Sequence, residues 1–432
     1  MSADVVIVGA GVIGAAAAFH LSLLGAGDVL VLDRATVGSG MSCRSSALVR
    51  MHYTFGPEVE LAVRSDAMFE AWPDLVGRPG CVRRTGFVRI VSPGEEEALR
   101  ANVAMQRALG ARAEVIDAAG LKEVAPGLRA DDVACAAWEP HGGYGDGAVV
   151  AGDLLAAARA RGVRYRPHAP VASLLTDGGR VIGVELAGSG SGAGGSEGSR
   201  PGGGPAGSGA GRSGTAGSRP GGGTAGRGAG GSGSGDRVYA GTVVLAAGVW
   251  SPPLLRTAGA ALPIETELHR VAVLAHGAGE GAPVACIDSV TQTYFRPEAG
   301  GAMTLVGAFA GQRGWDPDAA AAAAGEDLAP LVQAASRRVP ALEDAGIVRG
   351  VTGVYDMTPD ARPLLGRLAG LDGLIVAAGF SGMGFKIAPA VGEGIAGLIA
   401  GAPAGSVDLA PFRPGRLGDG RPIEPPNPYS DD

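Results

Sequence analysis

Residues 4–14 read DVVIVGAGVIG, and the chain around this stretch decides the fold. An alanine-rich segment continues to about residue 24, and a second apolar run, VLVL, occupies residues 29–32. The order predicts a strand, a glycine-rich turn, a helix and a second strand that ends at Asp33. Gly9 allows the tight turn, Gly11 lets backbone N–H groups approach a pyrophosphate at the helix N-terminus, and Gly14 lets the helix pack closely on the strand.

Asp33 completes this pattern, because an acidic residue at the end of the second strand binds the ribose hydroxyls of a dinucleotide. The order and the spacing of the parts agree, so we predict a dinucleotide-binding βαβ unit at the start of the chain. The motif by itself does not separate NAD from FAD.

The composition is that of a large globular protein. Its 432 residues are 46% hydrophobic and 18% charged, which is enough to bury a core across two domains and excludes a peptide, a coiled coil and a fully disordered chain. The net charge of −7 offers no basic face for a phosphate backbone, so no nucleic-acid partner is expected.

Cysteine usage and hydropathy predict the compartment. The cysteines are far apart and form no CxxC pair, so we predict neither a metal site nor a disulfide framework. No apolar run reaches the roughly 18 residues of a membrane span, and an apolar strand stands where a secretory leader would be. We therefore expect a cytoplasmic protein with no membrane span and with reduced thiols.

Residues 188–235 form a low-complexity insert of Gly, Ser, Ala, Pro, Thr and a few Arg, in which GSRPGGG occurs at residue 198 and again at residue 217. This composition has no large apolar side chains to offset the entropy of ordering, so it predicts a disordered, glycine-rich surface loop. Residues 180–186 and 237–245 on either side read as strands, so we expect the insert to extend a hairpin.

Two further strands end in small residues. They are TVVLAAGVW at 242–250 and GLIVAAG at 373–379, and the second runs into FSGMGFK at 380–386 and an apolar helix. A long cofactor that contacts residues from both ends of the chain would explain why both strands end in small residues. Segments 86–91, 133–138, 263–275 and 294–309 are typical of a mainly antiparallel sheet, so two interleaved domains are predicted.

Taken together, these motifs resemble the FAD-dependent amine and amino-acid oxidoreductases typified by D-amino acid oxidase, glycine oxidase and sarcosine oxidase. The resemblance also rests on the loop SGMSCRSSALVR at 39–50, YFRPE at 294–298, Tyr355 and TPD at 358–360. It covers nearly the whole chain apart from the insert and the tail after residue 411.

The resemblance implies an α/β fold with a Rossmann-like, glutathione-reductase-like FAD-binding domain interleaved with an α+β substrate domain. Residues 1–80, 145–262 and 345–410 would form the first domain. Residues 81–144 and 263–344 would form the second domain, whose mainly antiparallel sheet covers the flavin. Residues 411–432 would form a proline-rich tail.

The resemblance also implies which residues bind the cofactor. FAD is expected to be non-covalent, because Gly353 stands where some members attach the flavin through a cysteine. The expected cofactor-binding residues are Gly9, Gly11, Val12, Ile13, Gly14, Asp33, Arg34, Ser42, Cys43, Ser45, Ala247, Gly248, Gly379, Gly382, Met383, Gly384, Phe385 and Lys386.

Arg50 and Lys386 match the arginine and lysine that hold the substrate carboxylate in the sarcosine-oxidase branch, and Tyr355 matches a tyrosine of the substrate cavity. A guanidinium fork and an ammonium point charge suit a desolvated carboxylate. The alternatives are a structural ion pair for Arg50, a flavin contact alone for Lys386 and plain packing for Tyr355. His52, Tyr53, His141 and His269 are weaker candidates for substrate contact.

The expected function is FAD-dependent oxidation of the C–N bond of an amino acid or N-methyl amino acid, by hydride transfer to flavin N5, giving an imine that hydrolyses. Leu305 stands where oxidases of the family place an oxygen-activating lysine. The resemblance therefore does not imply rapid reaction with oxygen, and another electron acceptor is an open alternative. One alternative is an FAD-dependent monooxygenase, which needs NAD(P)H although no second credible dinucleotide motif exists. The other is a non-catalytic FAD-binding subunit of a heteromeric amine oxidase.

Overall fold

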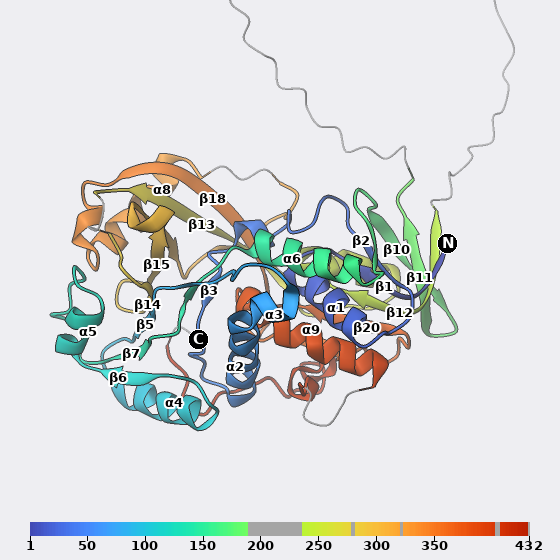
Figure 1. Ribbon diagram of the computed structural model, residues 1–432, viewed down its shortest axis with the longest axis horizontal. Helices are drawn as coiled ribbons and strands as arrows, with labels where there is room; N and C mark the ends of the chain where they lie inside the picture. The colour runs from blue at the N-terminus through green and yellow to red at the C-terminus, as the bar shows by residue number, and fades with distance from the viewer. Residues whose placement is uncertain (189–235, 278–280, 320–322, 402–406, 431–432) are drawn as a thin grey trace, which may run out of the picture.

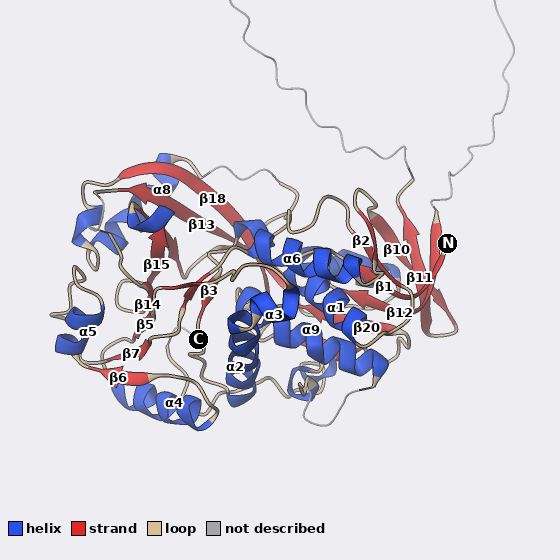
Figure 2. Ribbon diagram, in the orientation of Figure 1, coloured by secondary structure: helices blue, strands red, loops and turns tan. Residues whose placement is uncertain are grey.

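The computed structural model describes residues 1–188, 236–277, 281–319, 323–401 and 407–430. In this part of the chain two large sheets lie side by side along the long axis of the molecule (Figure 1). The N-terminal strand belongs to the first sheet, at the right of the view, and helices cover both sheets (Figure 2).

The first sheet is mixed, with a parallel centre. The parallel neighbours are β20 with β12, β12 with β1, β1 with β2, and β2 with β9, and the outer pairs are antiparallel. Its strands are β10 (Val171–Asp177), β11 (Arg180–Leu186), β12 (Arg237–Leu245), β1 (Ser2–Val8), β2 (Val29–Leu32), β9 (Arg164–Arg166), β20 (Leu374–Ala378) and β19 (Leu364–Arg367).

Strand β1 contributes to two cores because successive side chains of a strand point to opposite faces. Val5 and Ile7 pack under the helices, whereas Val6 and Val8 face β10, β11 and α7 (Ser251–Thr257). Helix α1 packs between α6 and α9 on the first of these faces, and α2 packs on α9. These helices are α1 (Val12–Leu23), α6 (Gly147–Ala160), α9 (Gly384–Ala400), α2 (Gly56–Glu70) and the short α3 (Trp72–Val76).

The second sheet is antiparallel except where β14 pairs with β5, which confirms the predicted mainly antiparallel sheet. Helices α4 (Glu96–Ala108), α5 (Ala118–Val124) and α8 (Gly325–Ser336) accompany it. Its strands are β17 (Gln312–Arg313), β13 (Glu265–Ala275), β16 (Met303–Ala308), β15 (Thr293–Glu298), β14 (Ala285–Asp288), β5 (Phe87–Ile90), β7 (Ala136–Glu139), β6 (Glu114–Ile116) and β18 (Gly346–Met357). A small sheet of β3 (Leu48–Val49), β8 (Gly143–Tyr144) and β4 (Arg83–Arg84) completes the fold.

Strand β18 belongs to the second sheet. The plan assigned residues 345–410 to the first domain, but β18 pairs with β13 along its whole length, from Glu265 opposite Met357 to Ala275 opposite Gly346. This pairing covers one edge of the long strand β13. The domain boundaries themselves remain predictions.

The strands that flank the insert pair as predicted. β11 and β12 are antiparallel, with Gly183 opposite Tyr239 and Glu185 opposite Arg237, and Leu186 N–H donates to the Asp236 carbonyl at 2.9 Å. The predicted disorder of the insert concerns residues that lie almost entirely outside the described ranges. No helix within those ranges combines the length and apolar character needed to cross a membrane.

Deleting residues 189–234 and closing the hairpin with a short glycine-containing turn is expected to leave flavin content and melting temperature nearly unchanged. The pairing of β11 with β12 is complete without them, and each doubling of a closed loop changes the closure free energy by only about 0.6 kcal/mol. Flavin absorbance per polypeptide and a thermal melt measure the outcome. Loss of flavin would mean that the insert contributes to the cofactor site.

Candidate functional site

The turn between β1 and α1 forms one wall of the site, and only glycine fits there. Gly9 has a φ of +106°, and a Cβ on it would lie 2.4 Å from the carbonyl oxygen of Ala246. A Cβ on Gly14 would lie 2.0 Å from the carbonyl oxygen of Gly9. The turn therefore packs directly on the end of β12, as the glycine motif requires.

Helix α1 starts at this wall. Its N-cap, Gly11, has no side chain to satisfy the first backbone N–H groups, and Val12 N–H donates to Ser42 Oγ at 3.0 Å. Asp33 is fixed beside the turn, because its Oδ2 accepts the Ala10 N–H at 2.6 Å. The positive end of the helix dipole thus lies where a phosphate group would be stabilised.

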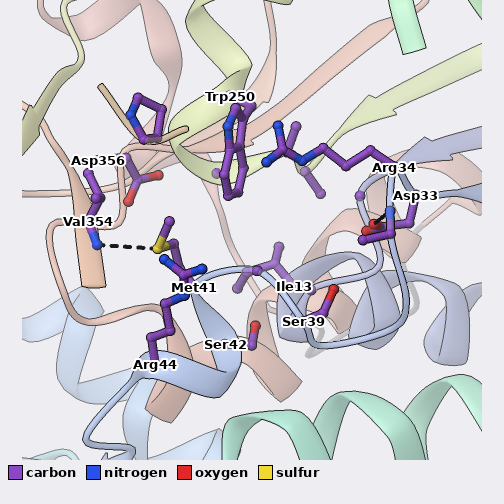
Figure 3. A pocket seen from close by; sticks show the side chains of 18 of the residues that line it. Ile13, Asp33, Arg34, Ser39, Met41, Ser42, Arg44, Trp250, Val354 and Asp356 are labelled. Carbon is purple, nitrogen blue, oxygen red and sulfur yellow. Dashed lines mark hydrogen bonds between the residues drawn. The ribbon is translucent and has the colours of Figure 1, made fainter. Parts of the chain in front are cut away.

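A cavity of about 1010 Å³ joins this helix start to β18 and to the glycine turn after β20 (Figure 3). Pockets for small molecules typically measure about 300–1,000 Å³, so this one suits a ligand as large as a dinucleotide. Its lining includes most of the predicted cofactor-binding residues: Gly9, Gly11, Val12, Ile13, Asp33, Arg34, Ser42, Ser45, Ala247, Gly248, Gly382, Gly384 and Phe385.

Five predicted residues do not line the cavity. Gly14 lies behind the turn, and Met383 packs in the apolar core under the helices. Cys43 is exposed, with its Sγ 3.2 Å from the Gly40 carbonyl oxygen. The Gly379 N–H is bound to Asp356, and Lys386 is buried in the first turn of α9.

Sequence reasoning missed a polar cluster at the Arg34 end of the cavity. The Arg34 guanidinium lies 4.2 Å from the centre of the Trp250 ring and 2.6 Å from Asp318 Oδ1. Trp250 Nε1 donates to the same oxygen at 3.1 Å. Trp250 carried a local signal, since it follows the small-residue strand, but Asp318 comes from a loop of the second sheet that has no motif.

Asp356, near the C-terminal end of β18, was also missed. Its Oδ2 accepts the Gly379 N–H at 2.6 Å, so Gly379 contacts this side chain. Burial raises the pKa of Asp356 to about 6, although backbone N–H groups act in the opposite direction. A carboxyl that titrates near neutral pH therefore lines the cavity.

Tyr355 lies in the cavity wall, next to Asp356. Its ring stacks on His269 with the ring centres 4.0 Å apart, and a Cβ on Gly382 would lie 2.7 Å from it, so glycine is required there. His269 Nε2 lies 3.0 Å from Glu267 Oε1, and burial lowers the pKa of this histidine. The tyrosine thus belongs both to the cavity and to a buried polar group in the second sheet.

Arg50 and Lys386 are close to each other but lie outside the cavity lining. Burial and the charge of Arg50 lower the pKa of Lys386 well below its usual value. Glu58 acts in the opposite direction, but its carboxylate also forms an ion pair with Arg362 at 2.9 Å. Among the described residues neither Arg50 nor Lys386 is in an ion pair, and Arg50 Nε is buried with no hydrogen-bond partner.

The other candidates for substrate contact lie in different places: two are near Arg50 and one is at the surface. Tyr53 lies under Arg50, with its ring centre 4.4 Å from the guanidinium carbon, and His52 is buried beside Tyr429. His141 lies at the surface, where it contacts Glu70 at 3.2 Å. His141 therefore has no place near the cavity.

Glu139 reaches the Arg50 segment from β7. Its Oε2 accepts the Met51 N–H at 2.8 Å, whereas Oε1 is buried without a partner. Burial raises the pKa of Glu139 to about 8, and the charge of Arg50 opposes this shift. No sequence signal marked this residue.

The glycine turn, the start of helix α1 and Asp33 fit the pyrophosphate and a ribose of FAD, and Gly248 and Gly384 also line the cavity. A dinucleotide-binding first sheet with an antiparallel second sheet over the far end of the cavity defines a two-domain flavoprotein class. The chain belongs to the DAO family, described as FAD dependent oxidoreductase, which matches residues 4–198 and 215–398.

Known relatives agree with this membership. The chain is 27% identical over 430 residues to 4-methylaminobutanoate oxidase (formaldehyde-forming) of Paenarthrobacter nicotinovorans, covering 94% of this chain and 45% of that protein. It is 26% identical over 427 residues to glycine oxidase of Pseudomonas putida, covering 97% of this chain and 100% of that protein. Human mitochondrial sarcosine dehydrogenase is 24% identical over 408 residues, covering 91% of this chain and 39% of that protein. The chain thus spans less than half of two of these three relatives.

A solved structure shows the same fold. L-proline dehydrogenase from P. horikoshii superposes with a TM-score of 0.79 at 22% identity, covering 98% of this chain and 99% of that one. The arrangement of an FAD-binding mixed sheet and a mainly antiparallel sheet is therefore confirmed.

The substitution Glu139→Gln is expected to stabilise the protein at pH 8 and to have little effect at pH 5. The pKa of this carboxyl is 4.5 when unperturbed and about 8 in the fold, so the folded state holds the extra proton and loses stability as pH rises between these values. At 1.36 kcal/mol per pKa unit the loss is at most about 5 kcal/mol, and glutamine avoids it.

Melting temperatures of parent and variant across pH 5–8 measure this difference. Glu123→Gln, at an exposed position of α5, is the matched control and should follow the parent. A Glu139→Gln curve parallel to the parent would mean that Glu139 is ionised in the fold.

Proposed function

We propose that the chain binds FAD and oxidises the C–N bond of an amino acid or N-methyl amino acid, giving an imine that water hydrolyses. The observation that carries this proposal is the pair formed by the half-buried Arg50 and the buried Lys386: the charge of Arg50 helps to lower the pKa of Lys386, and neither residue is in an ion pair among the described residues. A substrate carboxylate supplies the missing charge.

The electrostatic argument favours a carboxylate over a neutral group. Two like charges in a buried region repel strongly, and an anion between them restores the charged form of Lys386. The guanidinium provides two parallel donors and the ammonium provides a third. A neutral amine without a carboxylate gains none of these interactions.

Bound FAD supplies the hydride acceptor for this oxidation. The protein's own part is to orient the substrate: the two cations hold the carboxylate, and Tyr355 forms the wall between the cavity and the second sheet. Positioning of this kind accounts for much of the rate of such a reaction, because a neutral amine needs little acid–base assistance.

Non-covalent binding of FAD is part of the proposal. Gly353 lines the cavity and offers no thiol, and the Cys43 thiol is held within its own loop by contacts with the carbonyl groups of Ser39 and Gly40. The electron acceptor in this proposal is oxygen or another oxidant. Leu305, at the position of the oxygen-activating lysine, packs in an apolar cluster with Val273 and Phe87. The cytoplasmic location remains a prediction from the sequence.

Arg50→Ala is expected to weaken binding of the substrate carboxylate by about thirtyfold or more while the protein stays folded and yellow. Truncating one partner of a desolvated charge pair typically costs about 2–5 kcal/mol. The measurement is an anaerobic screen of amino acids, N-methyl amino acids and their amides, followed by loss of flavin absorbance.

The parent should reduce its flavin with a carboxylate substrate far better than with the matching amide, and Arg50→Ala should lose most of this preference. Arg83→Ala, at an exposed position of β4, is the matched control and should keep the preference. A parent that treats acid and amide alike would exclude carboxylate recognition, and no bleaching by any amine would exclude the oxidation itself.

FAD is expected to be released intact by acid or heat, because residue 353 is glycine and has no thiol that could bond to the flavin. The measurement is the absorbance of the supernatant after the denatured polypeptide has been removed. Yellow colour that stays with the pellet would show a covalent bond.

A further inference from the structure

The C-terminal segment returns to the candidate substrate site although it lies beyond the family match. That match ends at residue 398, and the structure describes the chain again from residue 407 to residue 430. Phe412 packs edge-on against Phe55, with ring centres 6.1 Å apart. Tyr429 is buried in an apolar cluster beside the second sheet, with Leu99 and Ala137 among its members.

Two anchors that do not involve Tyr429 hold this segment in place. Arg416 is almost fully buried and binds Asp360 with two hydrogen bonds, Nε to Oδ2 at 2.9 Å and Nη2 to Oδ1 at 2.8 Å. Asn102 Nδ2 donates to the Asn427 carbonyl at 2.8 Å. The path of the segment therefore does not depend on the hydroxyl group of Tyr429.

That hydroxyl group binds His52. The Tyr429 oxygen lies 2.9 Å from His52 Nε2, and the two rings stack with their centres 5.8 Å apart and an angle of 12° between them. Burial lowers the pKa of His52 well below its usual value, and the charges of Arg89 and Arg50 lower it further, so the imidazole is neutral. His52 Nδ1 has no hydrogen-bond partner, so the bond to Tyr429 is what orients the ring.

His52 in turn binds Arg50 through its backbone. Its carbonyl oxygen accepts a hydrogen bond from Arg50 Nη1. Between these two residues, the Met51 N–H is held by Glu139. The turn that carries Arg50 is thus fixed by β7 on one side and by the C-terminal segment on the other.

We propose that Tyr429 is a positioning residue, which orients His52 and, through the His52 carbonyl, holds the Arg50 guanidinium in the geometry that receives the substrate carboxylate. The inference rests on the proposed function, since it assigns Arg50 to the carboxylate. Tyr429 is not among the residues that line the cavity.

The hydroxyl affects direction and not charge. Without it the His52 ring loses its side-chain hydrogen bond, and the His52 carbonyl that accepts from Arg50 Nη1 is held less firmly. A two-donor contact to a carboxylate depends on the plane of the guanidinium, so a small rotation weakens it. Binding of an uncharged ligand of the same shape does not use this contact.

The test is an anaerobic titration of the flavin-containing enzyme with acetate and with acetamide, read from the perturbation of the flavin spectrum. Tyr429→Phe is expected to weaken acetate binding about five- to tenfold, the usual effect of losing one hydrogen bond, and to leave acetamide binding unchanged. With a carboxylate substrate the KM should rise by a similar factor while kcat stays within about twofold. FAD affinity should equal that of the parent, and the melting temperature should fall by no more than the loss of one buried hydrogen bond explains.

Two further variants make the result specific. Tyr239→Phe removes a hydroxyl group from an exposed tyrosine of β12 and should behave as the parent. In an Arg50→Ala background Tyr429→Phe should have no additional effect on acetate, because the residue through which it acts is gone.

The titration has three possible negative results, and each one contradicts a different part of the argument. If the parent prefers acetate to acetamide and Tyr429→Phe keeps the full preference, the positioning role is wrong while the carboxylate site stands. If Tyr429→Phe weakens acetate and acetamide equally, its role is general packing and the proposal is overturned. If the parent itself shows no preference, the assignment of Arg50 to the carboxylate is wrong, and the role of Tyr429 falls with it.

Discussion

The close backbone contact between Gly9 and Ala246 is the constraint on which the rest of the structure depends. A Cβ at Gly9 would lie 2.4 Å from the Ala246 carbonyl oxygen, so the turn before α1 and the end of β12 can meet only through glycine. This contact brings the start of helix α1 beside residues 246–248. Because β20 is the other parallel neighbour of β12, the glycine turn after β20 arrives at the same edge of the sheet. A cavity bounded by both ends of the chain follows from this convergence.

The second sheet completes the cavity through its edge strand. β18 pairs with β13, and residues 350–356 of β18 line the cavity in succession. Asp356 and Tyr355 therefore belong to the cofactor cavity although the strand that carries them belongs to the other sheet. One strand couples the two halves, so a change in the packing of the second sheet reaches the cavity directly.

Charge in the buried region behind the cavity is distributed unevenly. Glu58 is engaged by Arg362, and Glu139 holds a proton near neutral pH because burial raises its pKa to about 8. The charge of Arg50 therefore acts with burial to lower the pKa of Lys386, and Glu58 opposes them. Two like charges in a desolvated region repel each other, and this is the electrostatic basis of the carboxylate site proposed above.

The sequence by itself determined the dinucleotide turn, Asp33 and the antiparallel character of the second sheet, because each depends on local spacing along the chain, and the fold class followed from the resemblance of these motifs to a known family. Glycine at 9, 11 and 14 and alternating apolar residues act within one element and its neighbour. The membership of β18, the cluster of Arg34, Trp250 and Asp318, and the contact of Tyr429 with His52 were decided only by the tertiary structure. They join residues up to 377 positions apart, and no local pattern encodes which distant side chain will fill a buried space, since that depends on the packing of the whole chain.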